Sequence, residues 1–288
     1  MWDAGQYLRF GGERARPFFD LTAQVGATDP EYVVDLGCGP GNLTSALARR
    51  WPAAAVAGVD NSPEMIAAAQ KLAVPGLTFA LGDLWDWQPE RPPDVIVSNA
   101  VLQWIPGHDE LLRRWAGLLA PGGWLAFQLP GNFDGPSHVI IAELARSPRW
   151  AELLSGARLN RQAGDPADYV ELLAGPGFSV DAWETSYLHI LPGENAVLEW
   201  TKGSTLRPVL AALDAEQGAD FLAEYGERLR DAYRPHPFGT LLPFRRVFTV
   251  LHRTQPPAPE PAAPKPAAAE PAAAEPAAAE PRSANWKH

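Results

Sequence analysis

The feature that most constrains the fold of this chain is a glycine-rich turn between a short apolar run and a helical segment. Residues 31–36 read EYVVDL, which is typical of a buried strand, and residues 42–51 have the spacing of a helix. Between them, glycine occurs at every second position, at Gly37, Gly39 and Gly41. Because backbone without a Cβ atom can pass close to a ligand, this turn predicts a binding loop at the end of a strand.

Apolar runs and helical segments continue to alternate after this turn. We predict strands at 55–60, 77–81, 94–98 and 124–129, and helices at 63–72 and 108–119. Ser62 is placed to cap a helix, and Pro63 then takes the first helical position, where its missing N–H is harmless. This alternation predicts an α/β, Rossmann-like fold with a mostly parallel seven-stranded sheet and helices on both faces.

The part of the chain beyond residue 133 is less regular and predicts a cap over the sheet. We expect helices at 137–145, 167–174, 196–203 and 216–233, and strands at 180–191 and 244–251. Because helices lie before and between the last two predicted strands, these helices are free to cover the ligand edge of the sheet. We expect them to form a cap within about residues 133–235. We expect this cap to select the substrate.

The composition changes abruptly near Gln255, where a segment rich in proline, alanine and glutamate begins. Prolines every few residues block a continuous helix, and alanine buries too little surface to order such a segment. We therefore predict one folded domain over residues 1–254 and a disordered, low-complexity tail over residues 255–288.

The overall composition limits the partners of the chain. The formal net charge of −10 argues against nucleic acid, which favours a basic face. No apolar run reaches the roughly 18–20 residues of a membrane span, and the N-terminus lacks the apolar segment of a secretion signal. The single cysteine, Cys38, excludes an intrachain disulfide and a zinc cage. We expect a cytoplasmic monomer that holds no metal and binds neither nucleic acid nor membrane.

Three successive predicted strands each deliver an aspartate at or just after their carboxyl end. Asp35 directly precedes the glycine turn, Asp60 ends the second strand, and Asp83 follows the third. Asp35 is placed to receive an ammonium group, and Asp60 to accept hydrogen bonds from ribose hydroxyls. Asp83 and the N–H of Leu84 are placed to bind an adenine ring.

The spacing of the glycines separates two classes of nucleotide cofactor. A dinucleotide fingerprint reads G-x-G-x-x-G, and its helix N-terminus receives a pyrophosphate. This chain has G-x-G-x-G, with Asn42 where the third dinucleotide glycine would fall. Together with the three carboxylates, this spacing favours S-adenosylmethionine, which has no phosphate. The fourth strand end, with Asn99, Gln103 and Trp104, would then lie beside the transferable methyl group. We predict a cofactor site made of Asp35, Gly37, Gly39, Gly41, Asp60, Asn61, Asp83, Leu84 and Asn99.

Several blocks of the sequence resemble known methyltransferases. The blocks VVDLGCGPG, GVDNSPEMI, GDLWDWQP, SNAVLQWIP and LLAPGGWLAFQLP resemble class I S-adenosylmethionine-dependent methyltransferases. The blocks YLRFGGERARP, WETSYLHI, WTKGSTLRP and LPFRRVFTV are more specific, and with them the chain resembles the trans-aconitate 2-methyltransferase family. The resemblance runs from about Gln6 to Arg253 and implies formation of the monomethyl ester of trans-aconitate, with S-adenosylhomocysteine as the other product.

A carboxylate acceptor makes specific demands on the site. It is ionised at neutral pH, so we assign no catalytic residue as a general base. Catalysis would come from holding one oxygen in line with the sulfonium methyl where water is excluded. The other carboxylates need fixed donors, preferably arginine. Arg245 and Arg246 open the last strand on opposite faces, so only one can point inward. We predict a substrate-binding group of Arg14, His138, Tyr187 and Arg207.

Two alternatives stay open at the level of sequence. The acceptor could be another small or carrier-linked carboxylic acid, or a phenol, and a phenol would need a general base such as His138 or His189. The chain could also be a non-catalytic module that binds S-adenosylmethionine and docks a partner through its tail. The glycine turn and the three carboxylates argue for cofactor binding but do not by themselves prove turnover.

Overall fold

The computed structural model describes residues 11–157, 163–203 and 205–254, with no account of the side chains of residues 11–14. The predicted tail at 255–288 lies outside these residues, so the division into a domain and a tail stays a prediction. Within the described residues, no helix is both long and apolar enough to cross a membrane.

The predicted Rossmann-like sheet is confirmed. Within the described residues, seven strands follow the order β3-β2-β1-β4-β5-β8-β6, and the short β7, which was not predicted, adds an eighth strand by pairing with β8. The five strands from β3 to β5 are parallel, and β8 pairs antiparallel with both β5 and β6. The strands are β1 (Tyr32–Leu36), β2 (Ala55–Asp60), β3 (Leu77–Leu81), β4 (Val95–Asn99), β5 (Trp124–Pro130), β6 (Phe178–Leu191), β7 (Pro235–His236) and β8 (Gly239–Arg253).

Helices cover both faces of the sheet because successive strand residues point to opposite sides. Val33 packs into the core that contains α2 (Gly11–Ala23) and α3 (Thr44–Arg50), whereas Val34 packs into the core under α5 (His108–Leu118). Leu111, Leu112 and Trp115 of α5 are fully buried there. The helix α4 (Pro63–Ala69), capped by Ser62 as predicted, continues into η1 (Gln70–Leu72). A second short turn, η2 (Leu102–Trp104), follows β4.

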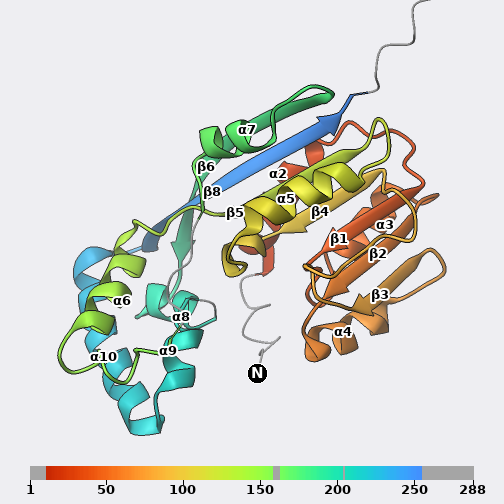
Figure 1. Cartoon of the computed structure of the whole chain (residues 1–288). Coiled ribbons are helices and arrows are strands. Elements are labelled where there is room, and N and C mark those ends of the chain that lie inside the picture. The colour runs from red at the N-terminus through yellow and green to blue at the C-terminus, as the bar shows by residue number, and fades with distance from the viewer. Residues whose placement is uncertain (1–10, 158–162, 204, 255–288) are drawn as a thin grey trace, which may run out of the picture. The chain divides into compact units, whose positions relative to one another are not determined.

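In the part of the chain that the structure describes, four helices form a cap with a hydrophobic core of its own. Figure 1 shows them gathered where β6 and β8 extend beyond the other strands. Trp150, Trp200, Phe221 and Tyr225 are the largest buried side chains of this core, and Leu191 of β6 and Leu242 of β8 also belong to it. The strands β6 and β8 therefore run through both the sheet and the cap. The cap helices are α6 (Pro136–Arg146), α8 (Ala196–Lys202), α9 (Arg207–Ala212) and α10 (Ala215–Ala232).

One helix inside the predicted cap range packs elsewhere. The helix α7 (Pro166–Leu173) buries Tyr169 and Leu173 in the core of the sheet beside α5. Its Tyr169 hydroxyl lies 3.1 Å from Nε2 of His108, and the backbone N–H of Gly164 donates to the same hydroxyl over 3.1 Å. Because α7 has the same amphipathic spacing as the cap helices, spacing alone did not assign it to a core.

Candidate active site

A cavity of about 960 Å³ lies at the carboxyl ends of the parallel strands and extends to the cap. One half is lined by residues that follow β1, β2, β3 and β4. The other half is lined by Trp200 of α8, Arg207 of α9, and Phe244 and Arg246 of β8. The cavity therefore lies between two parts of the protein. One is the sheet edge at which doubly wound folds bind ligands, and the other is the expected cap.

The glycine turn adopts the conformation that the sequence predicted. Gly37 and Gly39 have positive φ angles of 82° and 55°, which favour glycine. A Cβ atom on Gly37 would lie 2.2 Å from the side chain of Val101, and one on Gly41 would lie 2.8 Å from the ring of Phe79. A Cβ atom on Gly39 would meet nothing within 4 Å, and Gly39 lines the cavity. Gly37 and Gly41 are thus required by packing, whereas Gly39 leaves room for a ligand.

Asp35 places a carboxyl group in the floor of the cavity. The residue is only 2% exposed, and it accepts a 2.6 Å hydrogen bond from the Thr44 hydroxyl. Burial raises the pKa of Asp35 to about 7, because the ionised form loses its hydration. A cationic group bound beside Asp35 would oppose this effect and favour the carboxylate.

Two further aspartates line the same half of the cavity. Asp60 accepts one backbone hydrogen bond on each oxygen, from Gly39 and from Ser62, both at 2.9 Å. Its remaining lone pairs are free to accept from a ligand hydroxyl. Asp83 accepts from the backbone N–H of Trp85 over 2.8 Å. Asn61 and Leu84 lie beside these carboxylates in the cavity wall.

The end of β4 turns sharply next to the cavity. Ala100 has a left-handed φ of 58°, which costs a non-glycine residue about 1–2 kcal/mol. Its N–H donates to the carbonyl of Gln128 over 2.9 Å, and its own carbonyl accepts from the side chain of Gln103 over 2.7 Å. This turn leaves Asn99 in the cavity wall, where its Oδ1 accepts a 2.5 Å hydrogen bond from Nε2 of Gln128.

The cap half of the cavity carries cationic and aromatic side chains. Arg207 is the first residue of α9, and its partial burial lowers its pKa because the charged form is desolvated. The His138 ring has Nδ1 3.3 Å from the Ser137 hydroxyl and Nε2 3.4 Å from the Thr205 hydroxyl. The ring of Phe133 packs edge-on against His138, which holds the imidazole against the cavity.

Most of the predicted site residues meet in this one cavity. The predicted cofactor residues all line it except Gly41, which supports the turn from behind. From the predicted substrate group, His138 and Arg207 line it. The side chain of Arg14 lies outside the described residues. The cavity residues predicted from the sequence are Asp35, Gly37, Gly39, Asp60, Asn61, Asp83, Leu84, Asn99, His138 and Arg207.

Tyr187 lies away from the cavity. It is 4% exposed, and its hydroxyl donates to Oδ2 of Asp20 over 2.7 Å. The Arg16 guanidinium lies over its ring, 5.1 Å from the centre, so both contacts fasten α2 to β6. Burial raises the pKa of Tyr187, and the hydrogen bond to Asp20 raises it further. Tyr187 is the register partner of Phe244 and so shares the face of the sheet that carries Arg246, but its hydroxyl is bonded to Asp20 and it is not among the residues that line the cavity.

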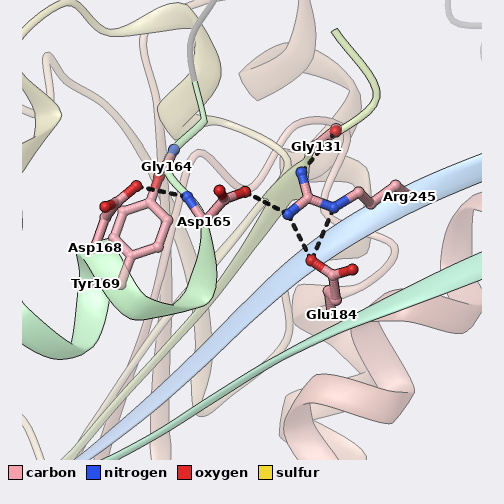
Figure 2. A network of polar contacts seen from close by, with 7 residues as sticks. All are labelled: Gly131, Gly164, Asp165, Asp168, Tyr169, Glu184 and Arg245. Carbon is pink, nitrogen blue, oxygen red and sulfur yellow. Dashed lines mark hydrogen bonds and ion pairs between the residues drawn. The ribbon is translucent and has the colours of Figure 1, made fainter. Parts of the chain in front are cut away.

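The structure decides between the two adjacent arginines of β8. Arg245 points away from the cavity and donates to Glu184 over 2.9 Å, to Asp165 over 2.6 Å and to the carbonyl of Gly131 over 3.0 Å (Figure 2). Arg246 lines the cavity and is 7% exposed. The sequence indicated that only one of them points inward, but it carried no signal for which one.

Comparison with known proteins agrees with the fold and the motifs. A family model described as a methyltransferase domain matches residues 33–123. The solved structure of the YcgJ protein from Bacillus subtilis aligns with a TM-score of 0.56 at 13% identity, over 85% of this chain and 99% of that one. Phosphoethanolamine N-methyltransferase 2 of Haemonchus contortus, solved with S-adenosyl-L-methionine, aligns with a TM-score of 0.54 at 18% identity, over 87% of this chain and 56% of that one. These likenesses show the fold.

Sequence relatives are far closer. The chain is 52% identical over 260 residues to a trans-aconitate 2-methyltransferase of Streptomyces avermitilis, a match that covers 88% of this chain and 97% of that protein. It is 53% identical over 253 residues to a trans-aconitate 2-methyltransferase of a Mycobacterium species, strain KMS, over 87% of this chain and 98% of that one. As its motifs indicated, the chain belongs to the trans-aconitate 2-methyltransferase family.

Proposed function

We propose that this chain transfers a methyl group from S-adenosylmethionine to one carboxylate of trans-aconitate. The products are the monomethyl ester and S-adenosylhomocysteine. The observation that carries the proposal is that one cavity joins a glycine turn with three aspartates to a cap half that contains two arginines and a histidine. The relatives named above, at about half identity, bear the name of this reaction.

The sheet half of the cavity suits the adenosyl and methionyl parts of S-adenosylmethionine. The open space above Gly39 is room that a side chain would fill. Asp35 would hold the ammonium group, Asp60 with Asn61 the ribose hydroxyls, and Asp83 with the Leu84 N–H the adenine ring. Gly37 and Gly41 would keep the turn close to the ligand, and Asn99 would lie near the reacting atoms. When bound, S-adenosylmethionine supplies an electrophilic methyl group on a sulfonium ion.

The cap half suits a polyanionic acid. Arg207 and His138 would hold carboxylates through donated hydrogen bonds. Because the charged form of Arg207 is partly desolvated, a bound anion would stabilise that charge. We retain Arg14 as a candidate from the sequence, and we leave Tyr187 out because its hydroxyl bonds to Asp20. Because the chain is acidic overall, this local cluster must provide the attraction for the substrate.

The chemical step requires positioning and no proton transfer. A carboxylate oxygen forms the new O–C bond while the S–C bond breaks, and the positive charge on sulfur disappears as the ester forms. Fixed donors that hold the acid would supply orientation, and walls from both the sheet and the cap would limit the access of water. We propose no general base, and His138 is assigned to binding. We also propose that the protein acts on the free acid as a cytoplasmic monomer without nucleic acid or metal.

The test is a mass-spectrometric assay of the purified full chain with S-adenosylmethionine and a panel of acceptors. The panel contains trans-aconitate, cis-aconitate, citrate and isocitrate, with a phenol and an amine as controls. We expect a monomethyl ester chiefly from trans-aconitate. Tight binding of the cofactor without an ester from any acid would contradict the assignment of the substrate, and a methylated phenol would point to the alternative acceptor.

A further inference from the structure

We infer that Gln128 is a positioning residue that makes one wall of the cavity offer only hydrogen-bond donors to a carboxylate of the acid. Gln128 does this by orienting Arg246, which we assign as a substrate-binding residue, and Asn99. We call Arg246, Gln128 and Asn99 the polar bridge. The inference rests on the proposed function, because it names the residues that select a carboxylate at the same site.

The polar bridge crosses three neighbouring strands at the edge of the sheet. Nη1 of Arg246, on β8, donates to Oε1 of Gln128, on β5, over 3.4 Å. Nε2 of Gln128 donates to Oδ1 of Asn99, on β4, over 2.5 Å. Asn99 and Gln128 are direct partners in the strand register, which fixes the short contact. Arg246 and Asn99 line the cavity, whereas Gln128 is 1% exposed and lies behind them.

The direction of every hydrogen bond in the polar bridge follows from Arg246. A guanidinium has only donors, so the oxygen of the Gln128 amide must face it. The NH₂ group of Gln128 must then face Asn99, and Asn99 must present its oxygen in return. Reversing either amide would place two donors against each other. The NH₂ group is therefore the part of the Asn99 amide that is left for the cavity.

This arrangement connects the cap half of the cavity to the sheet half. Arg246 belongs to the strand that continues into the cap, and its guanidinium lies over the Phe244 ring, 4.7 Å from the centre. Asn99 ends β4, the strand next to β1 with its Asp35. A carboxylate between Arg246 and Asn99 receives donors from both sides at the junction of the two halves. A neutral group in that place would not match two donors as well.

The test compares variants in a steady-state assay with trans-aconitate and in calorimetry with S-adenosylhomocysteine. Gln128→Glu keeps the shape of the side chain, but its carboxylate competes for Arg246 and forces Asn99 to turn its oxygen to the cavity. We expect KM for trans-aconitate to rise about 10- to 100-fold, and Arg246→Gln to raise it at least as much. The Kd of S-adenosylhomocysteine should change by less than about threefold in both variants.

Two controls separate positioning from a structural role. Gln217→Glu makes the same chemical change in the capping box of α10, at a residue that does not line the cavity, and should leave KM unchanged. Gln128→Glu gains an ion pair with Arg246, so its melting temperature should stay equal to that of the wild type or rise. A purely structural role for Gln128 predicts instead a lower melting temperature and a lower apparent kcat through loss of folded enzyme, with KM unchanged.

A second substrate shows which part of the acid the polar bridge binds. Mesaconate replaces the carboxymethyl arm of trans-aconitate with a methyl group. If Arg246 holds that arm, Arg246→Gln should affect KM for trans-aconitate much more than KM for mesaconate; equal effects assign Arg246 to a carboxylate that the two acids share. An unchanged KM for both acids in the Arg246 and Gln128 variants of an active enzyme would overturn the inference. A wild-type protein that makes no ester would instead contradict the proposed function, and the inference with it.

Discussion

The Asp35 carboxyl group, only 2% exposed, accepts a 2.6 Å hydrogen bond from the Thr44 hydroxyl, and its pKa is still raised to about 7. Desolvation therefore outweighs the hydrogen bond that favours the ionised form. Asp35 lines the cavity just before the glycine turn, so its ionisation is coupled to the binding of a ligand there.

The first prediction concerns the affinity for the cofactor as a function of pH. A bound ammonium group prefers the ionised Asp35, so the Kd of S-adenosylhomocysteine should rise as the pH falls below 7, approaching about tenfold per pH unit. Calorimetry in buffers with different ionisation enthalpies should show release of a proton on binding near pH 7. A Kd that does not change between pH 8 and pH 6 would contradict the assignment of Asp35 to the ammonium group.

The second prediction concerns stability. The pKa of Asp35 is higher in the folded state than the ordinary value of 3.8, so the folded state binds a proton more tightly than the unfolded state. The resulting stability is complete below the unfolded pKa and is lost as the pH rises through about 7. Asp35→Asn should therefore raise the free energy of unfolding at pH 8, by about 1–4 kcal/mol.

Urea denaturation at pH 8 and at pH 5 checks this sign. The gain from Asp35→Asn should be smaller at pH 5, where folded Asp35 is already protonated. The same variant should lose most of its affinity for S-adenosylhomocysteine. A variant that is less stable than the wild type at pH 8 would show that the hydrogen bond with Thr44 outweighs desolvation.

The third prediction separates two glycines of the same turn. Gly37→Ala places a Cβ atom 2.2 Å from Val101 in a left-handed backbone, so it should destabilise the protein by about 2–5 kcal/mol. Gly39→Ala meets no protein atom within 4 Å and should cost only the backbone strain of about 1–2 kcal/mol. Its methyl group should weaken the binding of S-adenosylhomocysteine by about tenfold or more. Thermal melts and calorimetry on both variants measure the two effects, and the reverse ranking would contradict the assignment.

The fourth prediction concerns His138. Because a carboxylate acceptor needs no general base, His138→Gln should raise KM for trans-aconitate about 5- to 50-fold and change kcat by less than about threefold. His236→Gln, on the exposed β7, is the matched control and should change neither constant. A loss of kcat by about 100-fold or more with KM unchanged would show that the imidazole takes part in the chemical step.

The cofactor half of the site was predictable because each of its residues is tied to a strand end. A parallel strand brings its carboxyl end to a common edge, so Asp35, Asp60 and Asp83 had to approach one another once the strands were recognised. The strand predicted at 55–60 matches β2, and the strand predicted at 77–81 matches β3. Local pattern and topology give the same answer in this part of the chain.

The cap half was less predictable because long-range packing decides it. The alternation along β8 separates Arg245 from Arg246 but does not reveal which face meets the cavity. Contacts of Arg245 with Asp165 and Glu184, distant in sequence, settle that choice. Tyr187 is absent from the cavity lining for the same reason, since its hydroxyl bonds over 2.7 Å to Asp20 of α2, which no local pattern connects to it. The six-residue α9, too short for a clear periodicity, was not predicted.

The two long antiparallel strands, β6 and β8, have a consequence for which acids fit the cavity. The pairing of β6 with β8 begins where Phe178 lies opposite Arg253 and ends where Leu191 lies opposite Thr240. A continuous hydrogen-bonded ladder therefore joins the core of the sheet to the core of the cap. A ladder of this kind resists bending far more than a loop does. The ladder would then keep the distance between the glycine turn, where the methyl donor binds, and Arg207 of the cap nearly constant. Acids would therefore be selected by their length as well as by their charge.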